Sequence, residues 1–368
     1  MKVISVFGTR PEAIKMAPIV KTLANSDQII SRVCVTAQHR HMLDQVLSLF
    51  EIEPDYDLNV MKAGQSPTQV AAAILQGLTS ILREEQPDWL LVQGDTTTVM
   101  AAAIGAFYAG VKVGHVEAGL RTYDKRQPFP EEINRRIASV TADVHFAPTA
   151  TARQNLLQEN IPADTVFVTG NPVIDALQWV ANLSYQPETG PLAGIPGRRR
   201  LILVTAHRRE NFGQPLENIC QALRSLAEAY KDDVQIVYPV HLNPNVQKPV
   251  YQALGDISNI TLLPPIEYLP FVYLLKNTHL VLTDSGGIQE EAPSLGKPVL
   301  VMREVTERPE AVEAGTVRLV GTDSSHIIET VRHLLDDPQA YQQMARAVNP
   351  YGDGRAAGRI KQALLKFG

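Results

Sequence analysis

The pattern that the whole chain repeats is first seen in Val3-Ile4-Ser5-Val6-Phe7-Gly8-Thr9-Arg10-Pro11-Glu12-Ala13-Ile14-Lys15. The apolar run Val3–Phe7 is typical of a buried strand, Gly8 permits a tight turn, and Pro11 suits the first turn of a helix. These residues therefore predict a strand at Val3–Phe7 and a helix at Pro11–Ala24. A strand that passes directly into a helix is the first half of a parallel βαβ unit.

The same alternation continues through the first half of the chain. The further strands predicted there are Ile29–Val35, Trp89–Val92, Val111–Val116, Val144–Ala147 and Val166–Thr169. The helices predicted between them include Thr68–Glu85, Thr97–Tyr108, Glu131–Thr141 and Thr149–Gln158. The strands are apolar along their whole length, which is typical of a parallel sheet covered by helices on both faces.

A linker separates this half from a second one, because Ser184–Arg200 contains three prolines and three glycines. The predicted strands then resume at Leu201–Thr205, Val234–Val240, Ile260–Leu263, Leu280–Thr283, Pro298–Met302 and Val317–Val320, with helices at Pro215–Tyr230 and Ile327–Leu335. At 368 residues the chain exceeds the roughly 250–300 residues at which single cores stop growing. The sequence therefore predicts an α/β protein with two doubly wound, Rossmann-like domains, residues 1–170 and residues 171–350 with the linker.

Composition argues against several classes of function. The formal net charge is −5, whereas proteins that bind nucleic acid usually carry a basic face. No apolar run approaches the ~20 residues of a membrane span, and the N-terminus has the pattern of a strand rather than a signal peptide. The two cysteines, Cys34 and Cys220, form no CxxC pair, so we expect buried free thiols in a cytoplasmic protein.

Cations follow the first strand of each half. Ligands of open parallel sheets bind beyond the carboxyl ends of the strands, so we expect two such domains to enclose one cleft with these ends. Arg10 and Lys15 lie near the predicted start of a helix, where they oppose its dipole, and a phosphate-bearing ligand relieves that conflict. His207, Arg208 and Arg209 follow the first strand of the second half, which an anionic site explains. The alternatives are a strand–helix corner with a surface arginine and a solvated run of charges.

A second phosphate-binding pattern is Thr283-Asp284-Ser285-Gly286-Gly287-Ile288-Gln289-Glu290-Glu291, which follows the strand Leu280–Thr283. Ser285, Gly286 and Gly287 expose a hydroxyl and backbone N–H groups at a helix start, which suits a diphosphate. Glu291 lies about one and a half helical turns further on, where a carboxylate can hold a ribose diol. The alternative is a glycine-rich corner that Ser285 caps.

Acidic residues gather at the strand ends of the first half. Asp95 follows strand Trp89–Val92, Glu117 follows Val116, and Glu131 and Glu132 follow Pro130. Asp95 alone is compatible with a helix N-cap, and the two neighbouring glutamates with ordinary first-turn acids. Glu117 has no comparable structural explanation. Carboxylates in a dry cleft can act as acids or bases, so these residues are candidates for proton transfer.

Two other patterns carry no prediction of function. Gly352-Asp353-Gly354-Arg355-Ala356-Ala357 matches a loose dinucleotide fingerprint, but no strand precedes it. Asp55-Tyr56-Asp57 has the spacing of a metal-binding DxD motif, but its setting predicts a loop. We therefore expect neither a metal nor NAD as a cofactor.

Taken together, the motifs resemble the non-hydrolysing UDP-N-acetylglucosamine 2-epimerase family, which has the GT-B fold. The resemblance runs nearly end to end, through Gly8–Lys15, Gln93–Asp95, His115–Arg121, Pro128–Arg136, His207–Asn211, Asp284–Glu291, Thr306–Glu310 and Asn349–Arg359. It implies that the last helix, within residues 351–368, crosses back to the N-terminal domain. It also implies a UDP-sugar as substrate and a UDP-binding C-terminal domain.

The resemblance assigns a role to individual residues of this sequence. It implies that the diphosphate is bound by Arg10, His207, Ser285, Gly286 and Gly287. It also implies that Glu291 binds the ribose, that Phe271 lies near the uracil, and that Arg308 reaches the sugar or phosphate. Lys15 and Arg135 are further expected to bind the substrate, and Asp95, Glu117, Glu131 and His207 are expected to be catalytic. Bacterial members bind a second UDP-N-acetylglucosamine as activator, for which Gln38, Gln45, Arg209 and His241 are the candidates here. A homodimer is also expected.

The chemistry of the implied reaction fits these groups. The C2 proton of the sugar is not α to a carbonyl, so the expected route removes UDP from C1 and the proton from C2, and then adds both back with the proton on the opposite face. Such a route needs cations on the diphosphate and carboxylates near C2. The alternatives are a UDP-sugar-dependent GT-B glycosyltransferase, a hydrolysing epimerase and a non-enzymatic nucleotide-sugar sensor.

Overall fold

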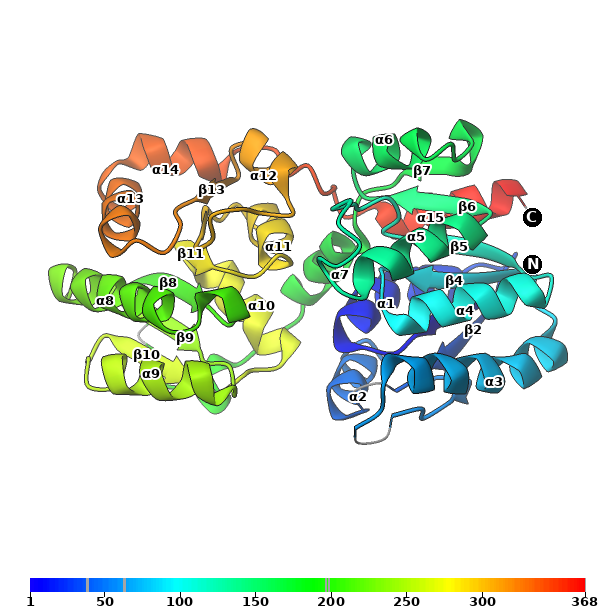
Figure 1. The fold of residues 1–368 in the computed structure, drawn as a ribbon. Coiled ribbons are helices and arrows are strands. Elements are labelled where there is room, and N and C mark those ends of the chain that lie inside the picture. The colour runs from blue at the N-terminus through cyan, green and yellow to red at the C-terminus, as the bar shows by residue number, and fades with distance from the viewer. Residues whose placement is uncertain (38–39, 62–63, 196, 198, 368) are drawn as a thin grey trace. The chain divides into compact units, whose positions relative to one another are not determined.

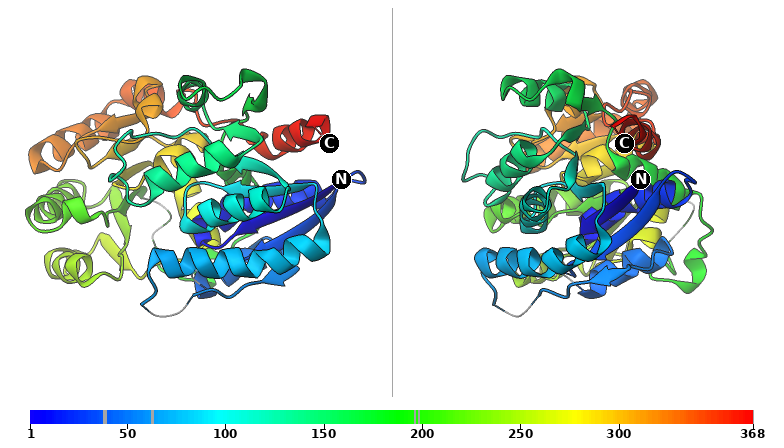
Figure 2. Two further views of the ribbon diagram at one scale, coloured as in Figure 1. Left: turned by 45° about the vertical axis from the view of Figure 1, so that its right-hand side comes forward. Right: turned by 90° about the vertical axis from the view of Figure 1, so that its right-hand side faces the viewer.

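The computed structural model describes residues 1–37, 40–61, 64–195, 197 and 199–367. Within these residues the strands form two parallel sheets, each flanked by helices (Figures 1 and 2). The first sheet contains β1 (Lys2–Phe7), β2 (Ile30–Val35), β3 (Tyr56–Asp57), β4 (Trp89–Gln93), β5 (Lys112–Val116), β6 (Val144–Ala147) and β7 (Val166–Val168). The second contains β8 (Arg200–Thr205), β9 (Val234–Pro239), β10 (Ile260–Leu263), β11 (Leu280–Thr283), β12 (Val299–Val301) and β13 (Val317–Leu319).

Helices connect the strands in both halves. The first half contains α1 (Arg10–Ala24), α2 (Arg40–Leu49), α3 (Pro67–Glu85), α4 (Thr97–Tyr108), α5 (Glu131–Thr141), α6 (Ala150–Gln158) and α7 (Pro172–Ala181). The second half contains α8 (Gln214–Ala229), α9 (Pro244–Leu254), α10 (Tyr268–Asn277), α11 (Ile288–Ser294), α12 (Pro309–Glu313), α13 (Ser324–Asp336), α14 (Pro338–Ala345) and α15 (Ala356–Phe367). Short 3₁₀ turns are η1 (Ala163–Thr165), η2 (Pro187–Thr189) and η3 (Arg209–Asn211).

Both sheets have the strand order of a doubly wound fold. The orders are β3-β2-β1-β4-β5-β6-β7 and β10-β9-β8-β11-β12-β13, and all pairs are parallel. Every predicted strand is confirmed to within one residue at each end. The predicted loop at Asp55–Asp57 is wrong, because Tyr56 and Asp57 pair with Cys34 and Val35 as a two-residue edge strand. Two residues are too few to show the alternation or apolar run that identifies a strand in a sequence.

The chain divides into two compact units. Unit 1 comprises residues 1–178 and 351–368, and unit 2 comprises residues 179–350. Unit 1 thus extends beyond the boundary placed at residue 170 and includes the first part of α7. Helix α15 packs against α1 in unit 1, and the Asp175 carboxylate of α7 accepts hydrogen bonds from the backbone N–H groups of Ala356 (3.1 Å) and Ala357 (2.9 Å).

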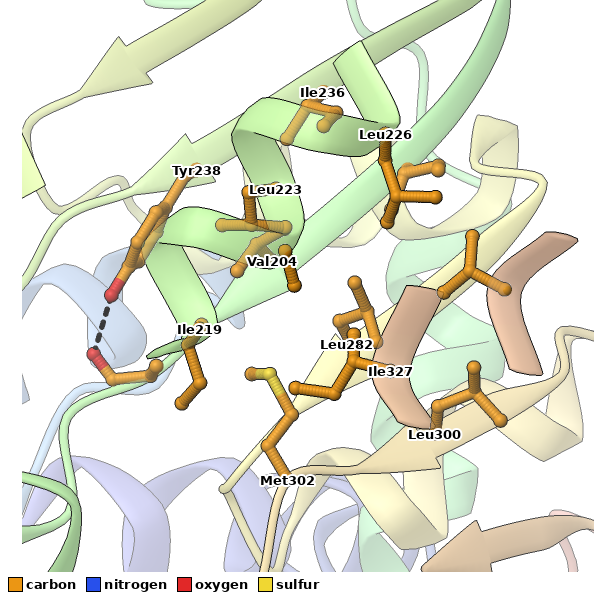
Figure 3. Packing of buried hydrophobic residues seen from close by; sticks show 14 of the residues in the cluster. Val204, Ile219, Leu223, Leu226, Ile236, Tyr238, Leu282, Leu300, Met302 and Ile327 are labelled. Carbon is orange, nitrogen blue, oxygen red and sulfur yellow. Dashed lines mark hydrogen bonds between the residues drawn. The ribbon is translucent and has the colours of Figure 1, made fainter. Parts of the chain in front are cut away.

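The hydrophobic core of unit 2 reaches the end of β8. Leu282 of β11, Ile236 of β9 and Leu223 of α8 are all fully buried in it (Figure 3). Tyr238 belongs to the same cluster, and its hydroxyl donates a hydrogen bond of 2.8 Å to the carbonyl oxygen of Ala206 (Figure 3). Because this bond anchors the residue that follows Thr205, the core fixes the point at which the polar loop after β8 begins.

Candidate active site

In each unit the candidate residues lie around the point where the strand order reverses. This topological switch falls between β1 and β4 in unit 1 and between β8 and β11 in unit 2. Open α/β sheets bind their ligands outside the carboxyl ends of the strands at such a point. Arg10 and Asp95 follow β1 and β4, and His207 and Ser285 follow β8 and β11. The switch points therefore coincide with the positions that the motifs predicted.

Glu117 is held by several donors in unit 1. Its backbone adopts φ 62°, a conformation uncommon for residues other than glycine, and only 7% of its surface is exposed. Lys15 Nζ lies 2.6 and 2.7 Å from its two carboxylate oxygens, and Asn171 Nδ2 donates to Oε1 at 2.8 Å. Gln93 Nε2 donates to Oε2. Donors of this kind stabilise a charged carboxylate.

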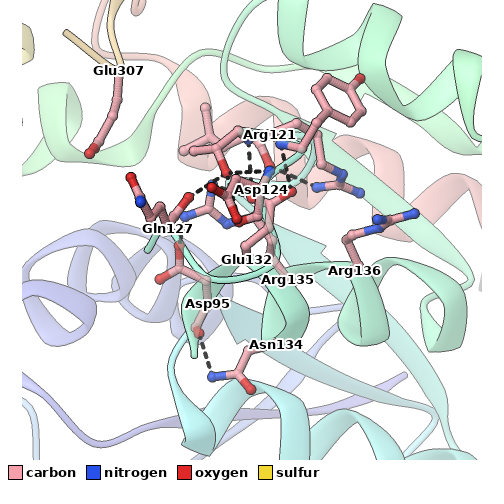
Figure 4. Close-up of polar contacts among 12 residues, drawn as sticks. Asp95, Arg121, Asp124, Gln127, Glu132, Asn134, Arg135, Arg136 and Glu307 are labelled. Carbon is pink, nitrogen blue, oxygen red and sulfur yellow. Dashed lines mark hydrogen bonds and ion pairs between the residues drawn. The ribbon is translucent and has the colours of Figure 1, made fainter. Parts of the chain in front are cut away.

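Asp95 lies in a contrasting environment. Burial raises the pKa of Asp95, and the nearby charge of Glu117 raises it further, while the paired Arg135 guanidinium opposes this. Asn134 Nδ2 donates at 3.0 Å to the backbone carbonyl of Asp95, which orients the loop (Figure 4). Pairs of carboxylates whose surroundings differ in this way are typical of acid–base sites.

The two neighbouring glutamates of α5 differ in their surroundings. Glu132 is fully buried, and its carboxylate accepts the N–H groups of Thr122 and Tyr123, each at 3.1 Å (Figure 4). It also lies 3.4 Å from Arg135, so its contacts are those of a residue that orders the loop before α5. Glu131, the first residue of α5, is only partly buried, and its catalytic role stays a prediction.

The turn that precedes Arg10 and helix α1 is hydrogen-bonded to the loop that carries Asp95. The buried Glu12 carboxylate accepts hydrogen bonds from Gly8 N (2.7 Å) and Thr9 N (2.8 Å), and the Thr96 hydroxyl donates to its other oxygen. Burial raises the pKa of Glu12, and these hydrogen bonds oppose the rise. Glu12 had no predicted role. The spacing Thr9-x-x-Glu12 is a capping box and could have identified the first half of this arrangement.

His115 of the neighbouring strand β5 contacts the same loop. Its Nε2 lies 2.7 Å from the carbonyl oxygen of Gly94, and since a carbonyl only accepts, Nε2 carries the proton. Burial lowers the pKa of His115 to about 3, so the ring is neutral in the folded protein. This neutral histidine orients the Gly94–Asp95 turn.

The protein is expected to lose stability as the pH falls below about 6.5. The unfolded chain protonates His115 near pH 6.5, whereas the folded protein does so only near pH 3. Because the unfolded state binds the extra proton in this window, the free energy of unfolding decreases with falling pH, by up to about 1.4 kcal/mol per unit. Burial also lowers the pKa of His279, to about 4, which acts in the same direction.

Urea unfolding at pH 7 and pH 5 tests this expectation. His115→Gln keeps a donor for the Gly94 carbonyl but cannot take up the proton. Relative to this variant, the wild type should lose about 2 kcal/mol more between the two pH values. An equal loss of unfolding free energy in both proteins would show that His115 has the same pKa in the folded and the unfolded protein.

In unit 2, the guanidinium groups of Arg208 and Arg308 both lie close to the backbone of Gly286. A Cβ built on Gly286 would lie 3.7 Å from Arg208 Nη2 and 3.7 Å from Arg308 Cζ. Arg308 is oriented by Glu290, whose Oε1 accepts from its Nε at 2.6 Å. Among the described residues, the buried Nε of Arg208 has no hydrogen-bond partner. Two guanidinium groups over a glycine at a helix start form a suitable place for an anion.

The sequence predicts an anionic site at Arg208 and Arg209 together, and the resemblance assigns Arg208 no contact of its own. Arg208 differs from Arg209 in its short distance to Gly286, and this distance cannot be derived from the sequence. Arg209 is exposed in η3.

The proposed ribose ligand, Glu291, is positioned by Tyr268, a residue that carries no motif in the sequence. The hydroxyl of Tyr268 donates to Glu291 Oε1 at 2.6 Å, and Glu291 is 8% exposed. Phe271 lies three residues after Tyr268 on α10, so the two side chains share a face of that helix. The structure thus brings the predicted uracil and ribose contacts to neighbouring elements of unit 2.

The predicted activator residues are placed only in part. The rings of His207 and His241 stack with centroids 5.6 Å apart, so the predicted activator residue His241 lies beside His207, the predicted catalytic residue. Gln45 lies in α2 of unit 1, and Gln38 lies outside the described residues. In the described part of the chain, no helix is long and apolar enough to cross a membrane, and no group of three or more His, Cys, Asp or Glu residues could hold a metal ion.

Two doubly wound units with acids and cations at their switch points define a GT-B-like enzyme. The family described as UDP-N-acetylglucosamine 2-epimerase matches residues 21–365. A UDP-N-acetylglucosamine 2-epimerase of Salmonella typhimurium is 58% identical over 373 residues, covering 100% of this chain and 99% of the relative. This chain belongs to that family of isomerases.

Solved structures agree with this assignment. The UDP-GlcNAc 2-epimerase from Neisseria meningitidis, bound to UDP-GlcNAc, matches with a TM-score of 0.91 and 53% identity, and the match covers 100% of both chains. A S. aureus protein in a co-structure with UDP matches with a TM-score of 0.88 and 47% identity, covering 100% of this chain and 96% of that one.

Proposed function

We propose that the protein interconverts UDP-N-acetylglucosamine and UDP-N-acetylmannosamine as a non-hydrolysing epimerase. The observation that carries the proposal is the contrast between two carboxylates that follow neighbouring strands: Glu117, after β5, is held by a lysine and amide donors, whereas burial raises the pKa of Asp95, after β4. The family membership and the relative solved with UDP-GlcNAc support the choice of substrate.

The proposed chemistry proceeds through elimination and re-addition. The C1–O bond breaks, its electron pair leaves with UDP, and a base takes the C2 proton, so that a C1=C2 double bond forms in 2-acetamidoglucal. UDP then adds back to C1 while C2 receives a proton on the opposite face. Neither step consumes water or a redox cofactor, so the atoms and electrons balance within the sugar, UDP and the protein's acids and bases.

The roles of the side chains follow from their surroundings. Glu117 is the proposed base, because Lys15, Gln93 and Asn171 stabilise its charged form. Asp95 is the proposed acid, since burial favours its protonated form. Glu131 remains a further candidate for proton transfer.

The cations bind the leaving group in this proposal. Arg10, His207, Arg208 and Arg308 neutralise the charge that develops on the diphosphate, which is the kind of stabilisation that lowers such barriers most. Ser285, Gly286 and Gly287 form the cradle, and Glu291, Phe271 and Arg135 complete substrate binding. Of these binding groups, Arg10 and Arg135 belong to unit 1 and the others to unit 2.

Three further features belong to the proposal. A second UDP-N-acetylglucosamine is proposed as an activator, and the stacking of His241 on His207 would connect its binding to the catalytic groups. A homodimer is the proposed assembly. The cytoplasm is the proposed compartment, because Cys34 and Cys220 are buried free thiols.

Incubation with UDP-N-acetylglucosamine alone, in D₂O and followed by proton NMR, tests the proposal. We expect a second UDP-sugar with the signals of the manno epimer and deuterium at C2 of both sugars. A glycosyltransferase would leave the sugar nucleotide unchanged without an acceptor, and a hydrolysing epimerase would release free N-acetylmannosamine and UDP. Epimerisation without deuterium at C2 would contradict the proton-transfer step.

A further inference from the structure

The carboxylate of Asp284 organises the polar loop that follows β8. Asp284 has no exposed surface and lies directly after β11. Its Oδ2 accepts three hydrogen bonds, from His207 N (2.8 Å), Arg208 N (2.8 Å) and Asn211 Nδ2 (3.0 Å). One oxygen therefore holds the backbone of the loop that carries the proposed diphosphate ligands.

The other oxygen of Asp284 faces the His207 ring. Oδ1 has no hydrogen bond among the described residues, and His207 Nδ1 lies 3.3 Å from it. The distance is close enough for an ion pair, although the geometry falls short of a hydrogen bond. A buried carboxylate oxygen without a donor is costly, and a proton on Nδ1 would remove that cost after a small rotation of the ring.

We propose that Asp284 is a positioning residue that acts through His207. It keeps the proton on Nδ1, so that Nε2 is the ring nitrogen available to the ligand. When the diphosphate binds, Nε2 takes up a proton and the imidazolium is held between Asp284 and the phosphate. The inference rests on the proposed function, which places His207 on the diphosphate.

The groups around His207 explain why such a carboxylate is needed. Partial burial lowers the pKa of His207, and Arg208 and His241 lower it further, while Asp284 alone raises it. The ring is therefore neutral without a ligand, and its tautomer depends on the hydrogen bond at Nδ1. The stacked His241 has the opposite arrangement, since its Nδ1 accepts the backbone N–H of Asn243 at 3.1 Å.

Asp284→Asn tests the proposal because it changes one oxygen with little change in shape. The amide oxygen can keep the three hydrogen bonds of Oδ2, while the NH₂ group then faces Nδ1 and requires it to accept. We expect ¹⁵N-detected NMR to show a proton on Nδ1 of His207 in the wild type and on Nε2 in the variant at pH 8. His207→Gln assigns the signals, and His241 is an internal reference for the Nε2–H tautomer.

The same variant has an expected effect on catalysis. We expect kcat to fall on the order of a hundredfold with a smaller change in KM, because the imidazolium is stabilised most as UDP leaves. Asn211→Ala is the matched control, since it removes a donor to Oδ2 and leaves the partner of Nδ1. If Asp284 only orders the loop, both variants will behave alike and His207 will keep one tautomer.

The outcomes separate this inference from the proposed function. If Asp284→Asn changes the tautomer of His207 but the wild type does not epimerise the sugar, the proposed function is overturned and the pairing of Asp284 with His207 Nδ1 is supported. A wild-type His207 with its proton on Nε2 overturns the pairing, even if Asp284→Asn does not fold. Wild-type epimerisation together with near-normal turnover in a folded Asp284→Asn also overturns it.

Discussion

Replacement of Glu117 by glutamine is expected to lower kcat for epimerisation by about a thousandfold. A positioned acid or base contributes roughly 10²–10⁴-fold, and glutamine keeps the shape and an acceptor for Lys15 while losing the basic oxygen. Because Glu117 is not among the proposed diphosphate ligands, the affinity for UDP should change little. Steady-state kinetics and calorimetric titration with UDP measure the two effects separately.

Two further variants serve as a second test and a control for this prediction. Asp95→Asn should lower turnover to a similar degree, since it removes the proposed acid, which follows the neighbouring strand β4. Glu53→Gln, at an exposed carboxylate, should leave turnover unchanged. Near-normal activity in both Glu117→Gln and Asp95→Asn would remove the basis of the proposed acid–base assignment.

Replacement of Gly119 by alanine is expected to destabilise unit 1 by roughly 3–5 kcal/mol. Gly119 adopts φ 92°, where residues with a Cβ are strained, and the added Cβ would lie 2.1 Å from the backbone carbonyl oxygen of Ala152. A backbone atom of α6 cannot rotate away as a side chain can. Gly119 lies two residues after Glu117, so relaxation of the clash should also displace the proposed base and reduce activity.

The chain offers a control for this substitution. Gly358 lies within α15, and no atom lies within 4 Å of a Cβ placed there, so Gly358→Ala should stabilise the protein by about 0.5–1 kcal/mol. Urea unfolding of both variants measures the difference. Equal midpoints for Gly119→Ala and the wild type would mean that the loop after β5 shifts freely, contrary to its contacts with α6.

The sequence was sufficient for every strand of both sheets except the two-residue edge strand β3. Apolar runs such as Val3–Phe7 and Leu280–Thr283 are buried on both faces, so their composition alone marks them as strands. The doubly wound order then places Asp95 and Ser285 at switch points without any further information. The GT-B-like fold and the family followed from motifs with this placement.

The supporting residues could not be predicted in the same way. Asn171 reaches Glu117 across 54 positions of the chain, and Asp284 reaches His207 across 77. Such contacts arise only when distant strands are brought together, and each residue taken alone has the pattern of an ordinary loop or helix start. Arg208 and Arg209 are chemically identical neighbours, and only the packing of the loop distinguishes the one that approaches Gly286.

The two crossings of the chain between the units have a consequence during translation. The backbone N–H of Asn171 donates to the Tyr351 carbonyl at 2.7 Å, and Ile360 and Leu364 of α15 are fully buried in unit 1. At roughly 5–20 residues per second, the ribosome delivers α15 on the order of ten seconds or more after it has finished β7. The nascent first unit must wait through that interval with the face of α1 uncovered, while the strands of the second unit are being synthesised.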